Sequence, residues 1–182
     1  SPKKKSLSDE MTKWGPPLSQ KERARIAKLS TTELVEMLKT GDTLHKSTAL
    51  SQLRANGGSE RNFDLLLSIA ADRRVGGGMI VEGLVSAIDE SASAEDKRRV
   101  DKFVDFLEAQ LKSAEPSVRH TQAVRSLGQA VHSPQSLPDR LDPEGIERKR
   151  PPYGYARVMG ILTACLDNTD WRVREEAIQR LG

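Results

Sequence analysis

Hydrophobic residues recur along most of this chain at the three- and four-residue spacing of an α-helix. The last stretch shows the pattern most clearly. Its apolar positions are i, i+4, i+5 and i+8 of one helix: Val173, Ala177, Ile178 and Leu181. Asp170 stands where an N-cap belongs, and Gly182 stands where a helix-ending glycine belongs. The pattern predicts a helix here with one buried face and one polar face.

The same reasoning predicts further helices along the chain. Their approximate ranges are 20–29, 31–39, 43–56, 60–71, 78–89, 94–113, 116–132 and 153–166. Serines stand at the expected N-caps of several of them: Ser19, Ser30, Ser59 and Ser93. Gly57 and Gly58 are expected to stop the 43–56 helix, with Ser59 capping the next one. The three adjacent glycines at 76–78 predict a tight turn, because they lack the Lys-Ser/Thr of a phosphate-binding loop.

A small residue lies in the middle of the apolar face in four of these helices, where it would let a second helix approach closely. These residues are Ala49, Gly83, Ala123 and Ala177. Helix pairs of this kind need a neighbouring pair to bury their other face. The prediction is therefore an all-α fold, an α-solenoid of about four stacked antiparallel helix pairs over residues 19–182. Residues 1–18 are expected to form a flexible basic arm, and residues 133–152 a Pro-rich loop insertion.

A sequence motif in the 170–182 stretch narrows this fold class. It reads acid, two residues, Val-Arg, two residues, Ala, three residues, Leu-Gly, and it resembles the HEAT repeat in the variant found in bilin-lyase-type HEAT proteins. An earlier copy at 115–128 carries one extra residue. The resemblance implies a ladder in which each Val-Arg arginine meets an acid or a carbonyl of the next repeat, with Arg157 as a further candidate. The residues of this repeat ladder would be Arg119, Arg174, Ala123 and Ala177.

Composition and charge limit the class of protein. Aromatic residues make up only 4% of the chain, which suits packed helices and disfavours a large β-sandwich. The net charge is +3, but residues 1–30 hold eight Lys or Arg against three acids, a balance of 8 − 3 = +5, so residues 31–182 carry 3 − 5 = −2. Cys165 is the only cysteine, which excludes an intrachain disulfide.

The sequence also suggests where the protein is located in the cell and whether the chain is a fragment. The sequence has no apolar run long enough for a membrane span and no hydrophobic signal core, so we expect an intracellular, cytoplasmic protein without a membrane partner. The chain begins without Met and stops inside a repeat, which suggests a piece of a longer protein.

Catalytic chemistry has little support in the sequence. The three histidines, His45, His120 and His132, have no ligand partner at metal-binding spacing. Cys165 falls on an apolar helix face, where a core role is expected. The acid pairs at 89–90 and 175–176 are expected on solvated helix surface or at a helix terminus. We therefore expect a protein that is not an enzyme, with no catalytic, cofactor-binding or metal-binding residue.

Two local features suggest binding. Trp14 either folds back onto the first helices or anchors a partner. The loop end from 147 to 155 places basic residues beside aromatic ones; its candidates for partner binding are Arg148, Lys149, Arg150, Tyr153 and Tyr155. These residues either bind phosphates or an acidic peptide, or form a solvated charge run with tyrosines packed on the adjacent repeat.

The leading functional hypothesis is a non-enzymatic protein-protein interaction scaffold that binds another protein or a peptide on its concave face and rim loop. The alternative is a nucleic-acid-binding HEAT-like module that uses the basic arm and residues 148–150. A lyase or glycosylase activity ranks third among the hypotheses, because no group of residues in the sequence supports it.

Overall fold

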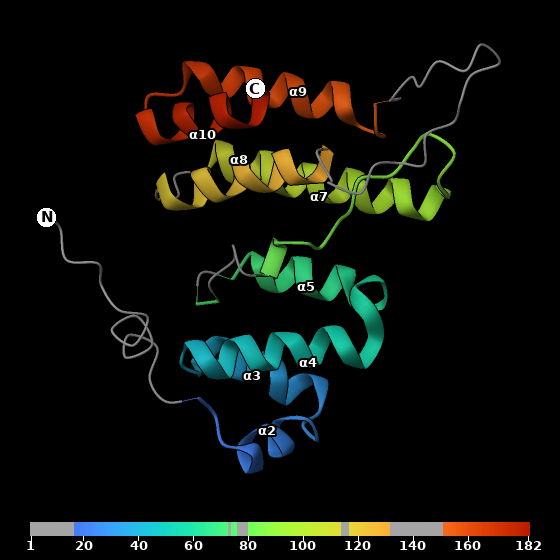
Figure 1. The fold of residues 1–182 in the computed structure, drawn as a ribbon, viewed down its shortest axis with the longest axis vertical. Helices are drawn as coiled ribbons and strands as arrows, with labels where there is room; N and C mark the ends of the chain where they lie inside the picture. The colour runs from blue at the N-terminus through green and yellow to red at the C-terminus, as the bar shows by residue number, and fades with distance from the viewer. Residues whose placement is uncertain (1–16, 73, 76–79, 114–116, 132–150) are drawn as a thin grey trace, which may run out of the picture. The chain divides into compact units, whose positions relative to one another are not determined.

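The computed structural model describes residues 17–72, 74–75, 80–113, 117–131 and 151–182 (Figure 1). Every regular element within these residues is a helix, which confirms the all-α prediction. The chain divides into two compact units, Ser1–Ile80 and Val81–Gly182. Both units contain fully buried apolar side chains, such as Leu34 in the first and Leu127 in the second.

The first unit is organised around one long helix. Its elements are α2 (Gln20–Ile26), α3 (Thr31–Thr40), α4 (Thr43–Arg61) and α5 (Phe63–Ala70). Helix α4 packs against α3 and also contacts α2 and α5. The predicted N-caps are confirmed here, because the side-chain oxygens of Ser19 and Ser30 accept hydrogen bonds from the backbone of Glu22 and Glu33.

Helix α4 departs from the sequence prediction at its C-terminal end. It continues through Gly57 and Gly58 to Arg61, so Ser59 lies inside a helix and does not cap one. The break comes at Asn62, whose side-chain Nδ2 donates to the Leu53 carbonyl oxygen at 2.6 Å. A glycine costs a helix only about 1 kcal/mol relative to alanine, so two of them do not end it. The residue that turns the chain is the asparagine.

The second unit consists of two helical hairpins. Its elements are α7 (Ala94–Lys112), α8 (Ser117–Val131), α9 (Tyr155–Ala164), the short 3-10 helix η1 (Cys165–Asp167) and α10 (Trp171–Leu181). Helix α8 packs against α7, α9 and α10, and Figure 1 shows the α9 and α10 layer lying over α7 and α8. The predicted apolar stripe of α7 is buried at Val100, Phe103, Val104 and Leu107.

Helices α8 and α10 run parallel, and so do α7 and α9. Arg125 of α8 contacts Glu176 of α10, a separation of 51 residues, and further along Gly128 lies against Arg180. Between α7 and α9, Tyr153 contacts Asp101 and Arg157 contacts Asp105, and the two residues of each pair are 52 positions apart. Because the separation hardly changes, each helix of the second hairpin runs parallel to the helix that it contacts in the first.

The helix predicted over 78–89 is wrong for the described residues. Only residues 80–81 are helical there, and residues 82–85 form turns and bends. Gly83 has a φ of 67°, and a Cβ built on it would meet no atom within 4 Å, so it supplies a left-handed turn and not a close helix approach. Ile80, Val81 and Leu84 are nevertheless buried. A compact turn can therefore bury the same apolar residues that suggested a helix.

Gly83→Ala should lower the free energy of unfolding by about 1–2 kcal/mol, because alanine at positive φ is strained while no neighbour clashes with its Cβ. Gly160→Ala is the matched control. It lies in α9 with nothing within 4 Å of a built Cβ, so it should raise stability by about 0.5–1 kcal/mol. Chemical denaturation measures both, and equal effects at the two positions would contradict the assigned backbone role of Gly83.

Candidate interaction surface

A buried carboxylate joins α8 to α10. Glu176 is 6% exposed, although the sequence placed it on solvated surface. Its carboxylate accepts from Arg125 Nε at 3.2 Å and Nη2 at 2.9 Å, and from Arg180 Nε at 2.9 Å and Nη2 at 2.7 Å. The hydrogen bond from Arg125 is the largest cause that lowers the pKa of Glu176. The carboxylate therefore remains ionised between two guanidinium groups.

Gly128 makes this close contact possible. A Cβ built at this position would lie 2.5 Å from Cδ and 2.8 Å from Cγ of Arg180. The aliphatic stem of Arg180 thus runs over the glycine on its way to Glu176. The Leu-Gly element of the earlier motif copy therefore has a packing role at the junction of the two hairpins.

The junction of α7 and α9 is polar and more exposed. Tyr153 donates from its hydroxyl to Asp101 Oδ2 at 2.9 Å, which raises the pKa of the phenol, and Lys97 Nζ lies 5.3 Å from its ring centroid. Arg157 donates to Asp105 Oδ1 at 2.6 Å and to Glu108 Oε2 at 2.9 Å. Tyr153 therefore packs on the adjacent hairpin, which is one of the two roles predicted for it.

Arg174 does not make the contact with a neighbouring repeat that the predicted arginine ladder requires. Arg174 donates to the carbonyl oxygens of Asn168 at 2.7 Å and Thr169 at 3.0 Å, in the turn before its own helix. Arg119 lies half-buried on α8. Arg125 and Arg157 form ion pairs between the hairpins, and the sequence singled out only the second. Ala123 and Ala177 are both buried, which agrees with their predicted small-residue positions.

Exposed apolar side chains gather on two helices. Within the described residues the exposed large ones are Val118 (61%), Trp171 (58%) and Ile178 (61%), on α8 and α10. Ile178 was predicted to point inward, and that prediction is wrong. Val118 was aligned with Val173, which is fully buried, but the extra residue in the earlier copy turns Val118 by about 100° around its helix.

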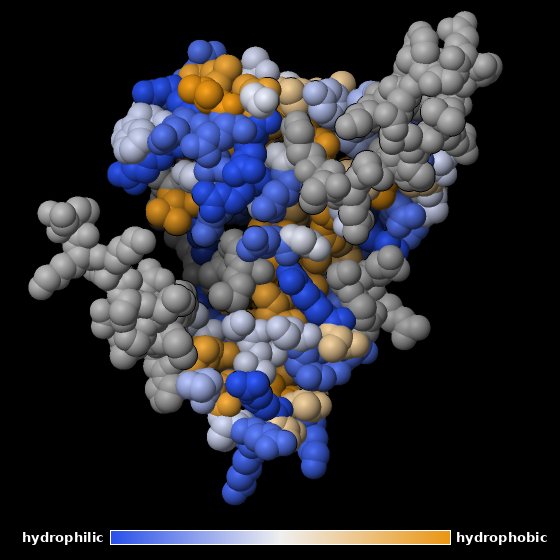
Figure 2. All heavy atoms as spheres, viewed as in Figure 1, coloured by the Kyte–Doolittle hydropathy of each residue, from blue (hydrophilic) through white to orange (hydrophobic). Residues whose placement is uncertain are grey.

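We call the exposed residues of the two helices and their charged neighbours the α8–α10 surface, with Ile178 on the side of α10 away from the contact between Arg125 and Glu176. Its members are Val118, Arg125, Trp171, Arg172, Glu175 and Ile178. The two helices carry five arginines and two acids, a balance of 5 − 2 = +3. The Arg172 guanidinium carbon lies 5.7 Å from the Trp171 ring centroid. Figure 2 shows mainly hydrophilic side chains on the visible side of this part, with smaller hydrophobic groups over the α9 and α10 hairpin.

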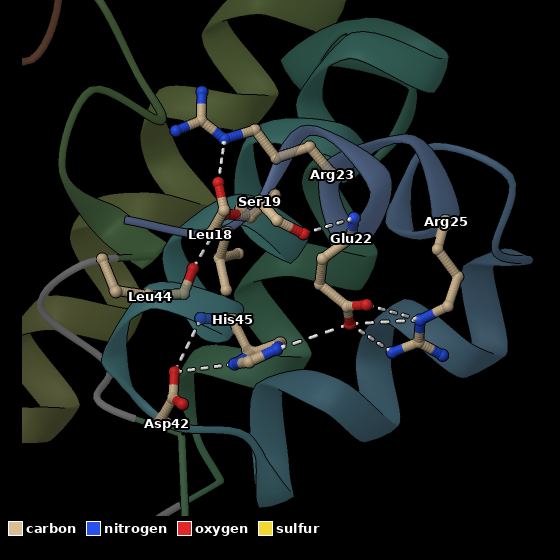
Figure 3. A network of polar contacts seen from close by, with 9 residues as sticks. Leu18, Ser19, Glu22, Arg23, Arg25, Asp42, Leu44 and His45 are labelled. Carbon is tan, nitrogen blue, oxygen red and sulfur yellow. Dashed lines mark hydrogen bonds and ion pairs between the residues drawn. The ribbon is translucent and has the colours of Figure 1, made fainter. Parts of the chain in front are cut away.

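The first unit holds a separate polar network (Figure 3). His45 Nδ1 lies 2.8 Å from Asp42 Oδ1, and His45 Nε2 lies 3.6 Å from Glu22 Oε1. Hydrogen bonding by Arg25 is the main cause that lowers the pKa of Glu22. The network joins α2 to the start of α4, which agrees with the predicted capping or surface role of His45.

Three other residues singled out in the sequence lie within the described residues. His120 lies with Nε2 3.1 Å from the Ser113 carbonyl oxygen, at the end of α7. Cys165 is 6% exposed, and burial raises the pKa of its thiol, as a core residue requires. Tyr155 is half-buried at the start of α9. The remaining candidates lie outside the described residues: Trp14, His132, Arg148, Lys149 and Arg150, with the arm at 1–16 and the loop from 132 to 150.

The described residues contain no group of three or more His, Cys, Asp or Glu side chains placed to hold a metal ion. None of the described helices combines the length and the hydropathy needed to cross a membrane. A comparison with models of known protein families, with curated proteins and with solved structures finds no match to this chain.

Glu176→Gln should lower the free energy of unfolding by about 1–2 kcal/mol, because a neutral amide replaces a buried carboxylate between two guanidinium groups. The cost stays at this level because the side chains of Arg125 and Arg180 are 52% and 31% exposed, so water solvates them in the variant. The exposed neighbour provides the control: Glu175→Gln should change stability by less than about 0.5 kcal/mol. Similar losses for the two variants in urea titrations would argue against the buried pair.

The same carboxylate should give the wild type a specific acid sensitivity. Because the folded pKa of Glu176 is lowered, its stabilisation is complete above the ordinary value of about 4.3 and is lost as pH falls through the folded pKa. The difference in unfolding free energy between wild type and Glu176→Gln should be constant near neutrality and shrink below about pH 4. Denaturation at a series of pH values measures it. A difference that persists at low pH would show that the charge is not its source.

Proposed function

We propose that this protein is a non-enzymatic interaction module, a HEAT-like solenoid of stacked helix pairs that binds another protein through the α8–α10 surface. The sequence prediction placed binding on a concave face and on the 133–152 loop. Residues 133–150 of that loop lie outside the described residues. The proposal therefore rests on the second unit.

The parallel register of the second unit supports the repeat architecture. Contacts between α8 and α10 join residues 51 apart, and contacts between α7 and α9 join residues 49 and 52 apart. A repeat protein produces this regularity, because each helix pair rests on its neighbour in the same orientation. The resemblance of the motif copies to HEAT repeats points in the same direction.

The observation that carries the binding proposal is the location of the exposed apolar side chains. A single exposed apolar residue is ordinary on a protein surface. Here Val118, Trp171 and Ile178 all belong to two helices that pack side by side. Tryptophan and arginine are the residues that most often dominate binding energy at protein interfaces. Trp171 with Arg172 supplies both, so we infer a partner with an apolar anchor and a nearby acid.

The nucleic-acid alternative has weaker support in the described residues. Of the basic residues in α2, Arg25 is paired with Glu22 at 2.7 Å, and Arg23 Nε donates to the Leu18 carbonyl oxygen at 3.1 Å. On the other unit Arg125 and Arg180 share Glu176. Arginines engaged in this way are less available to phosphates. The alternative depends on the arm and on residues 148–150.

A capture experiment tests the binding proposal. The immobilised full chain should retain specific partners from a cell lysate, and Trp171→Ala with Ile178→Ser should reduce their recovery at least about tenfold, because two anchor truncations cost more than 1 kcal/mol each. The matched control is Gln129→Ala with Thr163→Ala, at exposed positions of α8 and α9 outside the defined surface. Quantitative mass spectrometry compares the three proteins.

Two outcomes would contradict the proposal. Partners recovered equally by both double variants would show that the α8–α10 surface is not the binding surface. Tight binding to a nucleic-acid duplex that falls by orders of magnitude between low and moderate salt, and that is lost when residues 1–30 are deleted, would favour the alternative.

A further inference from the structure

Asn56 and Gly57 are neighbours near the C-terminal end of α4. An asparagine side chain reacts most readily with the main chain when the next residue is glycine, because glycine has no side chain to hinder the approach. The other two asparagines of the chain precede a phenylalanine and a threonine. Asn56 is therefore the asparagine whose sequence favours this reaction.

The reaction is deamidation, and its co-reactant is water. The backbone nitrogen of Gly57 bonds to the side-chain carbonyl carbon of Asn56 and loses its proton, and the side-chain nitrogen leaves as ammonia. Water then opens the resulting succinimide ring at either of its carbonyl carbons, which leaves aspartate or isoaspartate at position 56. In sum, an amide and water become a carboxylic acid and ammonia, with no change of oxidation state.

The helical conformation of α4 prevents this attack. A helix holds ψ at about −42° and directs the amide of Gly57 toward the carbonyl oxygen of Leu53, away from the Asn56 side chain. The Asn56 side chain is also held, because its Oδ1 accepts a hydrogen bond from Gln52 Nε2 at 2.6 Å. The reaction therefore requires α4 to open at this point.

The end of α4 is held by few packing contacts. Leu53 is the last residue of the helix among the described buried apolar side chains, and Ala55 and Asn56 are exposed to water. The pair Gly57 and Gly58 follows, and glycine favours a helix less than any residue except proline. Segments with few buried contacts open locally at a smaller cost in free energy than the whole fold. The end of α4 is such a segment.

One side chain ties this segment down from beyond the helix. Asn62 Nδ2 donates to the Leu53 carbonyl oxygen at 2.6 Å, across nine residues. The Asn62 side chain makes no capping hydrogen bond to α5, so its amide serves the end of α4. The hydrogen bond from Asn62 therefore stabilises the closed state, in which Asn56 is protected.

We propose that Asn56 is a modification site that deamidates spontaneously, at a rate set by how often the C-terminal end of α4 opens. Isoaspartate adds a carbon atom to the main chain, which the hydrogen-bond pattern of a helix does not accommodate. The modification therefore keeps the end of α4 from closing again. The site lies in the first unit and is independent of the α8–α10 surface.

Incubation of the full-length protein at mildly alkaline pH tests the proposal. Digestion at acid pH and mass spectrometry then measure the fraction deamidated at each asparagine. Asn56 should be modified first, with Asn62 and Asn168 as internal controls in the same sample. The reaction at Asn56 should be at least about tenfold slower in the folded protein than in urea, because the closed helix blocks it.

Matched variants separate the helix from the chemistry. Gly58→Ala should slow the reaction about fivefold in the folded protein and leave it unchanged in urea, because alanine only strengthens the helix. Gly57→Ala should slow it in both states, because the attacking residue gains a side chain. Asn62→Ala should speed it at least about threefold in the folded protein alone, because the hydrogen bond to Leu53 is lost.

Three results would overturn the proposal. Equal rates in the folded protein and in urea would show that α4 does not protect Asn56. Modification at Asn56 no greater than at Asn62 and Asn168 would remove the site itself. Folded-state rates that neither Gly58→Ala nor Asn62→Ala changes, with circular dichroism showing an intact fold, would show that opening of the helix end does not set the rate.

Discussion

The register between α8 and α10 depends on one buried carboxylate. Moving a carboxylate out of water costs several kcal/mol, and Glu176 offsets that cost only because two guanidinium groups donate to it from different helices. The interhelical pairing works in one register, since a shift of α10 along α8 would remove Arg125 and leave the carboxylate with only Arg180 of its own helix. Gly128 adds a steric condition, because only a residue without a side chain admits the stem of Arg180.

The two junctions between the hairpins differ in what they contribute. Arg157 and Asp105 in the α7 to α9 junction are 40% and 65% exposed, so water and salt screen their attraction and its net energy is small. Glu176 is shielded from solvent, and Val173 and Ala177 beside it are fully buried. We therefore expect the α8 to α10 junction to contribute more to the stability of the contact between the hairpins than the exposed ion pairs of α7 and α9.

The sequence predicted the local features well. Ser30 with Glu33 and Ser93 with Asp96 set helix starts by hydrogen bonds within four residues, and those helices begin where expected. Features that depend on distant residues were missed. In the sequence, Glu176 and Arg180 suggest an ordinary ion pair on the helix surface. Nothing there indicates that the Glu176 carboxylate is buried against α8 and contacted by Arg125. Gly83 shows the same limit, since its apolar neighbours suit both a helix and a turn.

The exposure of Ile178 extends this reasoning to function. Periodicity identifies which side of a helix is able to pack, but a neighbour decides whether that side is covered. In α10 the side with Glu176 holds the helix to α8, and the nearly opposite side with Trp171 and Ile178 is free of that task. Under the proposed function, stability and recognition use different residues of one helix. In that proposal, the side with Trp171 and Ile178 can change with the partner while the buried pair keeps the helix in place.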